Sequence, residues 1–334
     1  MAYQMSYDAN VGISPFAAGT SSGLVISSTA GRAREGTYSF RLRNPNYFQT
    51  HFITPTTSPA ISVWIYFDDP WFYDPTYTRV LEIALVTTTG HRISAFWNRP
   101  TKTFDIYVDG SLVKSGDADA VIDAGLLNVR IYGNIADSGN LTVNVNGYEI
   151  AIFTGDTLPN GSAAEIAYVE FKTTSTQSGV DLAFFSCISL NDGGLDPGDR
   201  RVYVRMVNSD ESIQWTRSTG AVSWSLLNNV PPVDTTYVQS VTTGQIDTLG
   251  LVDVSGLGTI QAVVKFARAL KTTGDAQTLL NGVESGATVH TTENVLSTVL
   301  AYHYDIMPVD PATTVAWDMA GINALKAYHE SVIP

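Results

Sequence analysis

Two tight turns constrain the fold of this chain more than any other feature of its sequence. Thr103–Val108 runs into Asp109-Gly110, and Leu141–Val145 turns at Asn146-Gly147 into Tyr148–Ile152. Asp-Gly and Asn-Gly tolerate the positive φ angles that two-residue turns between antiparallel strands require. The sequence therefore predicts β-hairpins at both places.

Other strand-like segments follow one another at short intervals through the first 190 residues, each bounded by Gly, Pro or Asn. They are Leu24–Ser27, Tyr38–Leu42, Ile61–Phe67, Val80–Val86, Arg92–Trp97 and Leu182–Leu190. Apolar and polar residues alternate in Tyr38–Leu42, as in a strand with one face in water. No helical periodicity interrupts the series, so we expect a two-sheet antiparallel sandwich.

Composition gives both halves of the chain enough apolar material for a core. The 334 residues are 44% apolar and only 15% charged, and 19 Lys and Arg oppose 32 Asp and Glu. The net charge of −13 repels phosphate backbones, which argues against nucleic acid as a partner. The single cysteine, Cys187, excludes an intrachain disulfide and lies in an apolar segment that predicts a buried thiol.

The amino-terminal segment MAYQMSYDANVG has neither the basic start nor the apolar run of a secretory signal. No apolar run in the chain approaches the length that spans a bilayer. We therefore expect a soluble protein made in a cytoplasm, without membrane insertion.

The stretch from Asn191 to Tyr203, NDGGLDPGDRRVY, is rich in Gly, Asp and Pro and marks a boundary. We predict two domains, residues 1–193 and residues 194–334. A flexible tether would contain more Gly and Ser and less Pro, so we expect a short, ordered hinge.

The second half is also predicted to be mainly strands. They are Arg201–Val207, Tyr237–Val238, Ile246–Leu249, Thr259–Arg268 and Val295–Tyr304, with apolar stubs at Ser212–Trp215 and Ser223–Leu226. Asp318 is a helix cap, and Met319, Ile322 and Leu325 follow at helical spacing through Lys326. The prediction is an all-β chain of two antiparallel β-sandwiches, the second smaller and with a short C-terminal helix.

The first half resembles the jelly-roll domains of concanavalin A-like and laminin G-like proteins, as they occur in bacteriophage structural proteins. The hairpin LTVNVNGYEIAIFTGDT and the later strand VDLAFFSCISLNDGG carry the resemblance. It implies that the last strand returns beside the first, so that residues 5–8 pair near Leu182–Leu190.

Residues 191–328 resemble the C-terminal domain of a group of bacteriophage virion proteins that are tail, neck or minor structural components. The segments GLDPGDRRVYVRMVNSD, GQIDTLGL and DPATTVAWDMAGINAL are among those that carry it. The resemblance implies a non-enzymatic structural component of a tail, collar or baseplate, located in the virion, with other virion proteins and copies of itself as partners. The alternative is a lectin-like adhesin that recognises a host surface polysaccharide.

The loop Asp68–Tyr77 contains four aromatic and three acidic residues. Exposed aromatic rings anchor protein interfaces, and rings beside carboxylates also suit sugars. The candidate residues for an interface or a glycan site are Asp69, Trp71, Phe72, Tyr73, Asp74 and Tyr77, with a self-packed loop or subunit contact favoured over a glycan site. Its acids are candidate Ca²⁺ ligands, but they lack an ordered ligand ladder, so solvated turn carboxylates are favoured and no cofactor is expected.

The sequence contains no recognisable motif for catalysis or for metal binding. Glycoside hydrolases with the jelly roll use two carboxylates close together on one strand, whereas Glu82, Asp105 and Glu149 stand singly in their strands. The histidines share no metal-ligand spacing; they are His51, His91, His290, His303 and His329. We therefore predict that the chain is not an enzyme. After the virion structural protein and the lectin-like adhesin, a degenerate glycosidase is the third hypothesis.

Overall fold

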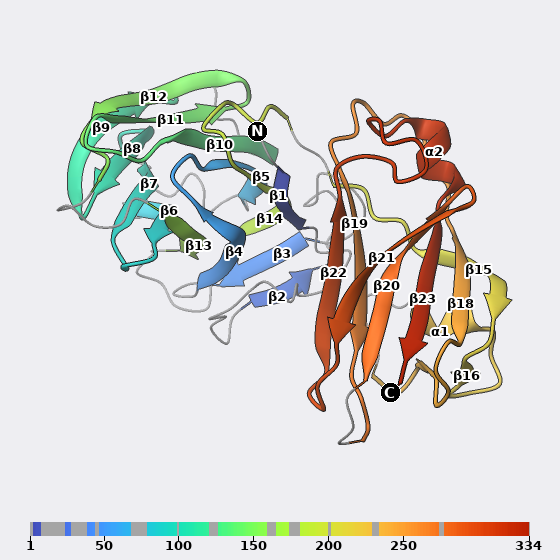
Figure 1. Cartoon of the computed structure of the whole chain (residues 1–334). Helices are drawn as coiled ribbons and strands as arrows, with labels where there is room; N and C mark the ends of the chain where they lie inside the picture. The colour runs from blue at the N-terminus through green and yellow to red at the C-terminus, as the bar shows by residue number, and fades with distance from the viewer. Residues whose placement is uncertain are drawn as a thin grey trace. The chain divides into compact units, whose positions relative to one another are not determined.

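A computed structural model shows two compact units, Met1–Tyr203 and Val204–Pro334 (Figure 1). It describes residues 3–7, 24–27, 39–43, 47–67, 79–98, 100–119, 126–158, 165–173, 181–199, 202–228, 234–273 and 277–333. Nearly all the regular structure is antiparallel strand, with only two short helices among these residues. The predicted all-β class is confirmed.

One sheet of the first unit has eight strands. Their order is β12 (Tyr148–Gly155), β11 (Gly139–Val145), β10 (Leu126–Asn134), β5 (Ala60–Phe67), β14 (Asp181–Asn191), β3 (Ser39–Arg43) and β2 (Leu24–Ser27), and β1 (Tyr3–Tyr7) also pairs with β14. Met5 lies opposite Leu190 and Ser6 opposite Ser189. The predicted return of the last strand beside the first is confirmed.

The other sheet of the first unit has six strands. Their order is β4 (Tyr47–Thr56), β13 (Ile166–Thr173), β6 (Arg79–Thr87), β7 (Arg92–Asn98), β8 (Thr103–Val108) and β9 (Ser111–Asp117). Both predicted hairpin turns are present, because Asp109 and Asn146 have φ angles of 46° and 52° and the following glycines are also positive.

Aromatic rings from both sheets meet in the core of the sandwich. Phe48 and Phe171 of the six-stranded sheet are stacked with ring centroids 4.7 Å apart, and Phe185 of the eight-stranded sheet lies 5.3 Å from each. At the edge, a Cβ at Gly116 would lie 2.1 Å from the carbonyl oxygen of Ile150, so only glycine lets β9 approach β12 this closely. Cys187 is buried, as predicted.

The second unit has two layers. A five-stranded sheet runs in the order β15 (Val207–Ile213), β18 (Ile246–Leu251), β23 (Lys326–Val332), β20 (Thr278–Ser285) and β21 (Thr288–Val295). A two-stranded ribbon of β19 (Val263–Ala269) and β22 (Ala301–Met307) forms the second layer, and β16 (Thr216–Arg217) pairs with β17 (Val238–Gln239). The core residues are Val283, Met307, Trp317, Ile322 and Leu325.

Several element boundaries in the second unit differ from the prediction. The strand predicted at Arg201–Val207 is wrong, since β15 begins where it was expected to end. Ser223–Leu226 is not strand-like but part of helix α1 (Ser223–Leu227). The two carboxylate oxygens of Asp210 accept from the backbone N–H groups of Ser223 and Trp224, so a residue 13 positions away satisfies the start of this helix.

The C-terminal helix α2 (Met319–Ala324) is confirmed, and the Asp318 side chain accepts from the N–H of Gly321 as a cap. The helix ends sooner than predicted, and β23 follows it directly as the middle strand of the five-stranded sheet. The single strand predicted over Val295–Tyr304 is also wrong. Strand β21 ends at Val295, and β22 starts only at Ala301.

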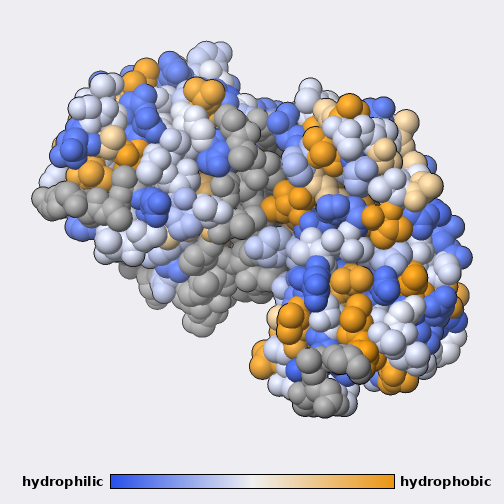
Figure 2. All heavy atoms as spheres, in the orientation of Figure 1, coloured by the Kyte–Doolittle hydropathy of each residue, from blue (hydrophilic) through white to orange (hydrophobic). Residues whose placement is uncertain are grey.

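The surface carries apolar residues in small groups. On the face of the second unit that Figure 2 shows, hydrophobic residues are separated by hydrophilic ones. Apolar residues scattered in this way are normal for a protein surface and mark no docking site. Neither of the two helices among the described residues is long and apolar enough to cross a membrane. A functional site is therefore better sought among the polar networks.

Candidate functional site

The predicted aromatic and acidic loop lies outside the described residues, which end at residue 67 and resume at residue 79. Its six candidates, Asp69, Trp71, Phe72, Tyr73, Asp74 and Tyr77, therefore stay predictions. The described strand before these residues, β5, belongs to the eight-stranded sheet, and the described strand after them, β6, belongs to the six-stranded sheet.

A polar network covers the middle of the six-stranded sheet on the side away from the core. Along β6, Leu81, Ile83 and Leu85 are buried in the sandwich, so alternation places Glu82 on the opposite face. Registers bring further polar residues from neighbouring strands to this face, which we call the polar face. It comprises Gln49, Glu82, Arg92, Ser94, Asn98, Asp105, Ser115, Tyr168, Glu170 and Lys172, with the rings of Phe96 and Tyr107.

Arg92 holds the centre of the polar face together. Its Nη2 atom lies 3.0 Å from Oε1 of Glu82 and 2.7 Å from Oε1 of Glu170. Ser94 donates to the same Glu82 oxygen at 2.7 Å, and Gln49 donates to Oε2 of Glu170 at 2.9 Å. Two carboxylates thus share one guanidinium and each has a second donor.

The Arg92 side chain is more exposed to solvent than the two carboxylates that it contacts. The carboxylates of Glu82 and Glu170 are 7% and 9% exposed, whereas the Arg92 side chain is 35% exposed. Because Nη2 makes both ion pairs, the Nη1 and Nε donors of Arg92 have no hydrogen-bond partner within the described part of the chain. The site therefore presents oriented donors above two buried acids.

Electrostatics keep this centre charged. Burial alone lowers the pKa of Arg92, but the hydrogen bonds and charges of Glu170 and Glu82 outweigh burial and raise the pKa above its ordinary value. Burial, followed by the nearby charge of Glu170, raises the pKa of the Tyr168 hydroxyl. Both groups therefore remain hydrogen-bond donors at physiological pH.

A second part of the polar face lies on β7, β8 and β9. Asp105 is 4% exposed and accepts from Asn98 at 3.0 Å and from Ser115 at 2.5 Å. Beside it, the rings of Phe96 and Tyr107 meet edge to face with centroids 5.1 Å apart. Aromatic surface next to fixed polar groups is the usual composition of a small-ligand site.

Glu82 and Asp105 stand singly in their strands, but they are not solvated acids, because both are buried and hydrogen-bonded on the polar face. The turn at Thr89-Gly90 between β6 and β7 fixes the register of this hairpin, which places Arg92 and Glu82 on one face. Glu170 gave no such signal, because it reaches this face through pairing between strands distant in sequence.

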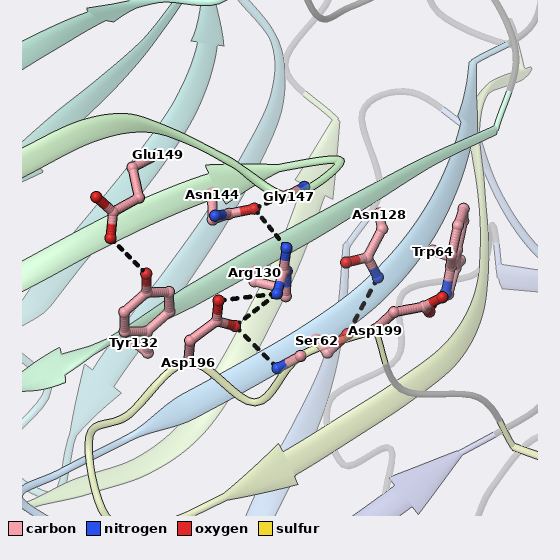
Figure 3. A network of polar contacts seen from close by, with 11 residues as sticks. Ser62, Trp64, Asn128, Arg130, Tyr132, Asn144, Gly147, Glu149, Asp196 and Asp199 are labelled. Atoms are coloured by element: carbon pink, nitrogen blue, oxygen red, sulfur yellow. Dashed lines mark hydrogen bonds and ion pairs between the residues drawn. The ribbon is translucent and has the colours of Figure 1, made fainter. Parts of the chain in front are cut away.

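A different network holds the predicted hinge on the outer face of the eight-stranded sheet (Figure 3). Nη1 of Arg130 donates to both carboxylate oxygens of Asp196 at 2.7 and 2.8 Å, and Nη2 donates to Asn144 at 2.8 Å. Asp199 accepts from the indole N–H of Trp64 at 3.1 Å. This network holds the segment around Asp196 and Asp199 against the sheet. Its polar groups are therefore already used in structural hydrogen bonds.

The histidines form no metal site among the residues that the structure describes, where no group of three or more His, Cys, Asp or Glu could hold an ion. His91, in the turn between β6 and β7, instead contacts Asp109 of the turn between β8 and β9, with Nδ1 2.8 Å from Oδ2. His290, His303 and His329 lie on strands of the second unit, and the side chain of His51 is outside the described residues.

No protein-family model matches the chain, and no curated protein matches it. Solved structures do match. They include the cellulose induced protein Cip1 (14% identity, 58% of this chain and 100% of that one, TM-score 0.44). Arcelin-5, a lectin-like defense protein from Phaseolus vulgaris, matches at 8% identity over 58% of this chain and 100% of its own, with a TM-score of 0.42.

An endo-β-1,4-glucuronan lyase from the fungus Trichoderma reesei also matches, at 10% identity over 59% of this chain and 99% of its own, with a TM-score of 0.39. These similar structures are lectin-like jelly rolls, and none of the three is described as a virion protein. At such low identities the likeness concerns the fold.

The prediction that the chain is not an enzyme is corrected by these matches, because polysaccharide lyases are among them. The prediction rested on the missing carboxylate pair of glycoside hydrolases, and that absence excludes one hydrolytic mechanism only. It does not exclude cleavage of a polysaccharide by other chemistry on the same architecture.

Proposed function

We propose that the first unit binds a saccharide on its polar face and that glycan recognition is the function of this chain. The observation that carries the proposal is the arrangement around Arg92. A guanidinium anchored by two buried carboxylates keeps its remaining donors in a fixed orientation, so a ligand that bonds to them loses little side-chain entropy on binding.

The neighbouring groups suit a sugar. Hydroxyl groups of a saccharide both donate and accept hydrogen bonds, and on this face the remaining N–H groups of the partly exposed Arg92 are donors for the hydroxyl oxygens. The ring of Phe96, which is partly exposed and meets the buried ring of Tyr107 edge to face, adds apolar surface of the kind that packs on the C–H side of a sugar ring.

The charge of the site favours a neutral saccharide over a polyuronate. The polar face carries the carboxylates of Glu82, Glu170 and Asp105 against the cations of Arg92 and Lys172, and the whole chain has a net charge of −13. An anionic polysaccharide approaching this surface is repelled at low ionic strength.

The test is a glycan array with neutral and acidic polysaccharides, followed by calorimetry on the saccharides that bind. Arg92→Lys keeps the positive charge but removes the planar donors, and we expect affinity to fall on the order of tenfold. Arg268→Lys makes the same change in the second unit, where Arg268 pairs with Asp234, and should leave affinity unchanged.

Two outcomes overturn the proposal. They are the absence of binding to any saccharide and unchanged affinity of the Arg92→Lys variant. Release of new sugar ends from a bound polysaccharide would show that the polar face also cleaves what it binds. Preferential binding of acidic saccharides would overturn the neutral class alone.

The virion role inferred from the resemblance of residues 191–328 stays a prediction. It is compatible with the proposal, since a particle that recognises a host surface polysaccharide needs a saccharide-binding face. The glycan array decides whether the alternative, lectin-like reading of the sequence is the better one.

A further inference from the structure

The two layers of the second unit enclose a cluster of titratable side chains. Alternation along the ribbon turns Lys265 of β19 and His303 and Asp305 of β22 toward the same side. Contacts of Lys265 with residues of β20 and β23 show that this side faces the five-stranded sheet. Ionisable groups between two packed layers are costly unless they are paired.

Lys265 is the centre of the cluster. Its Nζ atom donates to the backbone carbonyl oxygen of Phe266 at 2.9 Å and to Oδ1 of Asn281 at 3.2 Å, and it lies 3.0 Å from Nε2 of His329. Asp305 faces Lys265 across the ribbon pair. One ammonium group thus connects the ribbon to two strands of the sheet.

The surrounding groups come from every strand packed against Lys265. Nε2 of His290 on β21 lies 3.1 Å from Oδ2 of Asp305, and the Nε2 atom of His303 is buried without a hydrogen-bond partner in the described chain. On β18, Asp247 lies directly opposite His329, and its Oδ2 atom is also buried without a partner there. His329 therefore stands between a cation on the ribbon and an acid on its neighbouring strand.

The ribbon has a different attachment at its other end. Val263 and Met307 pack with the apolar core around Trp317, Ile322 and Leu325, and the indole N–H of Trp317 donates to the Met307 carbonyl oxygen at 2.8 Å. This end depends on buried apolar area, which does not titrate. Only the middle of the ribbon depends on protonation states.

Burial, and then the charge of Lys265, hold the pKa of His329 well below its ordinary value, so His329 is neutral at pH 7 and accepts from Lys265. Burial lowers the pKa of Lys265 to about 7 although Asp305 opposes the effect. Burial also lowers the pKa of His303. Acid therefore adds positive charge at His329 and His303 beside a lysine that is already charged.

We propose that His329 is an acid-operated switch that releases the β19–β22 ribbon from the five-stranded sheet. In its neutral form the imidazole accepts a hydrogen bond from Lys265 and joins the two layers. Once protonated it has no acceptor atom left, is repelled by Lys265, and turns toward the carboxylate of Asp247 across the strand pair. The middle of the ribbon then loosens, while the apolar end stays packed.

Hydrogen exchange of the full chain at neutral pH and at about pH 5, expressed as protection factors, tests the switch. We expect acid to lower protection in β19 and β22 by up to about tenfold per pH unit below about 6.5, and to leave β18 unchanged. His329→Gln keeps an acceptor for Lys265 without titrating and should remove most of the loss, leaving only the part that His303 contributes. His91→Gln, in the first unit, is the matched control and should behave as wild type.

Two further variants keep the test decisive if His329→Gln does not fold. Lys265→Met removes the like charge and should reduce the acid response of the ribbon. Asp247→Asn keeps an acceptor for the N–H groups of Gln214 and Trp215, and should make the ribbon respond only at lower pH. An unchanged acid response in these variants, or equal loss of protection throughout the second unit, would overturn the switch.

Discussion

At the scale of single residues, the first unit depends on one cation shared between two buried acids. Removing one member of such a group leaves the others buried with fewer partners, which costs more than a surface pair is worth. Arg92 is therefore both the proposed contact to a ligand and a structural residue, and the two roles need separate measurements.

The substitution Glu170→Gln tests the structural role of the Arg92 group separately from ligand binding. The change keeps the size of the side chain but removes the charge that Arg92 and Gln49 contact. We expect the free energy of unfolding to fall by about 2 kcal/mol, measured by urea denaturation.

Asp109→Asn is the control for that measurement, because Asp109 forms a pair with His91 that is partly exposed to solvent. It should change stability by less than about 1 kcal/mol. Equal effects of the two variants would contradict the special role of the buried group.

At the scale of elements, residues 191–203 are more than a spacer between units. Figure 3 shows that Asp196 and Asp199 are bonded to side chains of the eight-stranded sheet through Arg130 and Trp64. Burial and the hydrogen bond to Glu149 raise the pKa of Tyr132 in the same network to about 12, so its hydroxyl stays a donor at physiological pH.

Asp196→Ala removes the double hydrogen bond that holds this segment. We expect limited proteolysis within residues 194–203 to become faster, on the order of tenfold, because loss of the charge-assisted hydrogen bonds from Arg130 costs about 1.5 kcal/mol. Leu195→Ser alters an adjacent side chain that is 66% exposed and should leave the rate of cutting as it is. Rapid cutting of the unaltered chain in this segment would contradict an ordered hinge.

The sequence predicts hairpins better than it predicts pairings between distant strands. Asp-Gly and Asn-Gly turns identify β8–β9 and β11–β12, since the signal lies in the turn itself. β4 and β13 were not predicted, and both contribute residues of the polar face. Gln49 and Glu170 come together across 121 positions, and no local pattern encodes that distance.

The two helices also show that local signals are predictable and long-range ones are not. Asp318 caps α2 from the adjacent position, so its pattern is visible in the sequence. Asp210 satisfies the start of α1 from a separate strand, so Ser223–Leu226 has no cap of its own to reveal it. Contacts within a few residues are predictable from the local pattern of this chain, whereas the one long-range pairing that was predicted, β1 with β14, came from the resemblance to jelly rolls.

At the scale of the whole molecule, the chain forms two separate units, and we expect them to respond differently to pH. The pKa of Lys265 is about 7 in the folded state against an ordinary 10.5. The unfolded second unit therefore binds this proton more readily between those values, so its stability rises as pH increases through that range.

We expect the melting temperature of the second unit to increase from about pH 7 to about pH 9, because its free energy of unfolding rises by at most about 1.4 kcal/mol per pH unit from this one group. Lys265→Met should flatten the dependence, and scanning calorimetry at several pH values measures both. A melting temperature that does not change over this range in the unaltered chain would contradict the burial of the lysine.

The pairing of β1 with β14 also governs how the first unit can form during synthesis. A ribosome must add residues up to about 191 before strand β1 can meet its neighbour, which at 5–20 residues per second takes roughly ten to forty seconds. Throughout that interval the nascent chain has an incomplete sheet with unpaired strand edges. Early translation is thus the period when this protein most needs protection from aggregation.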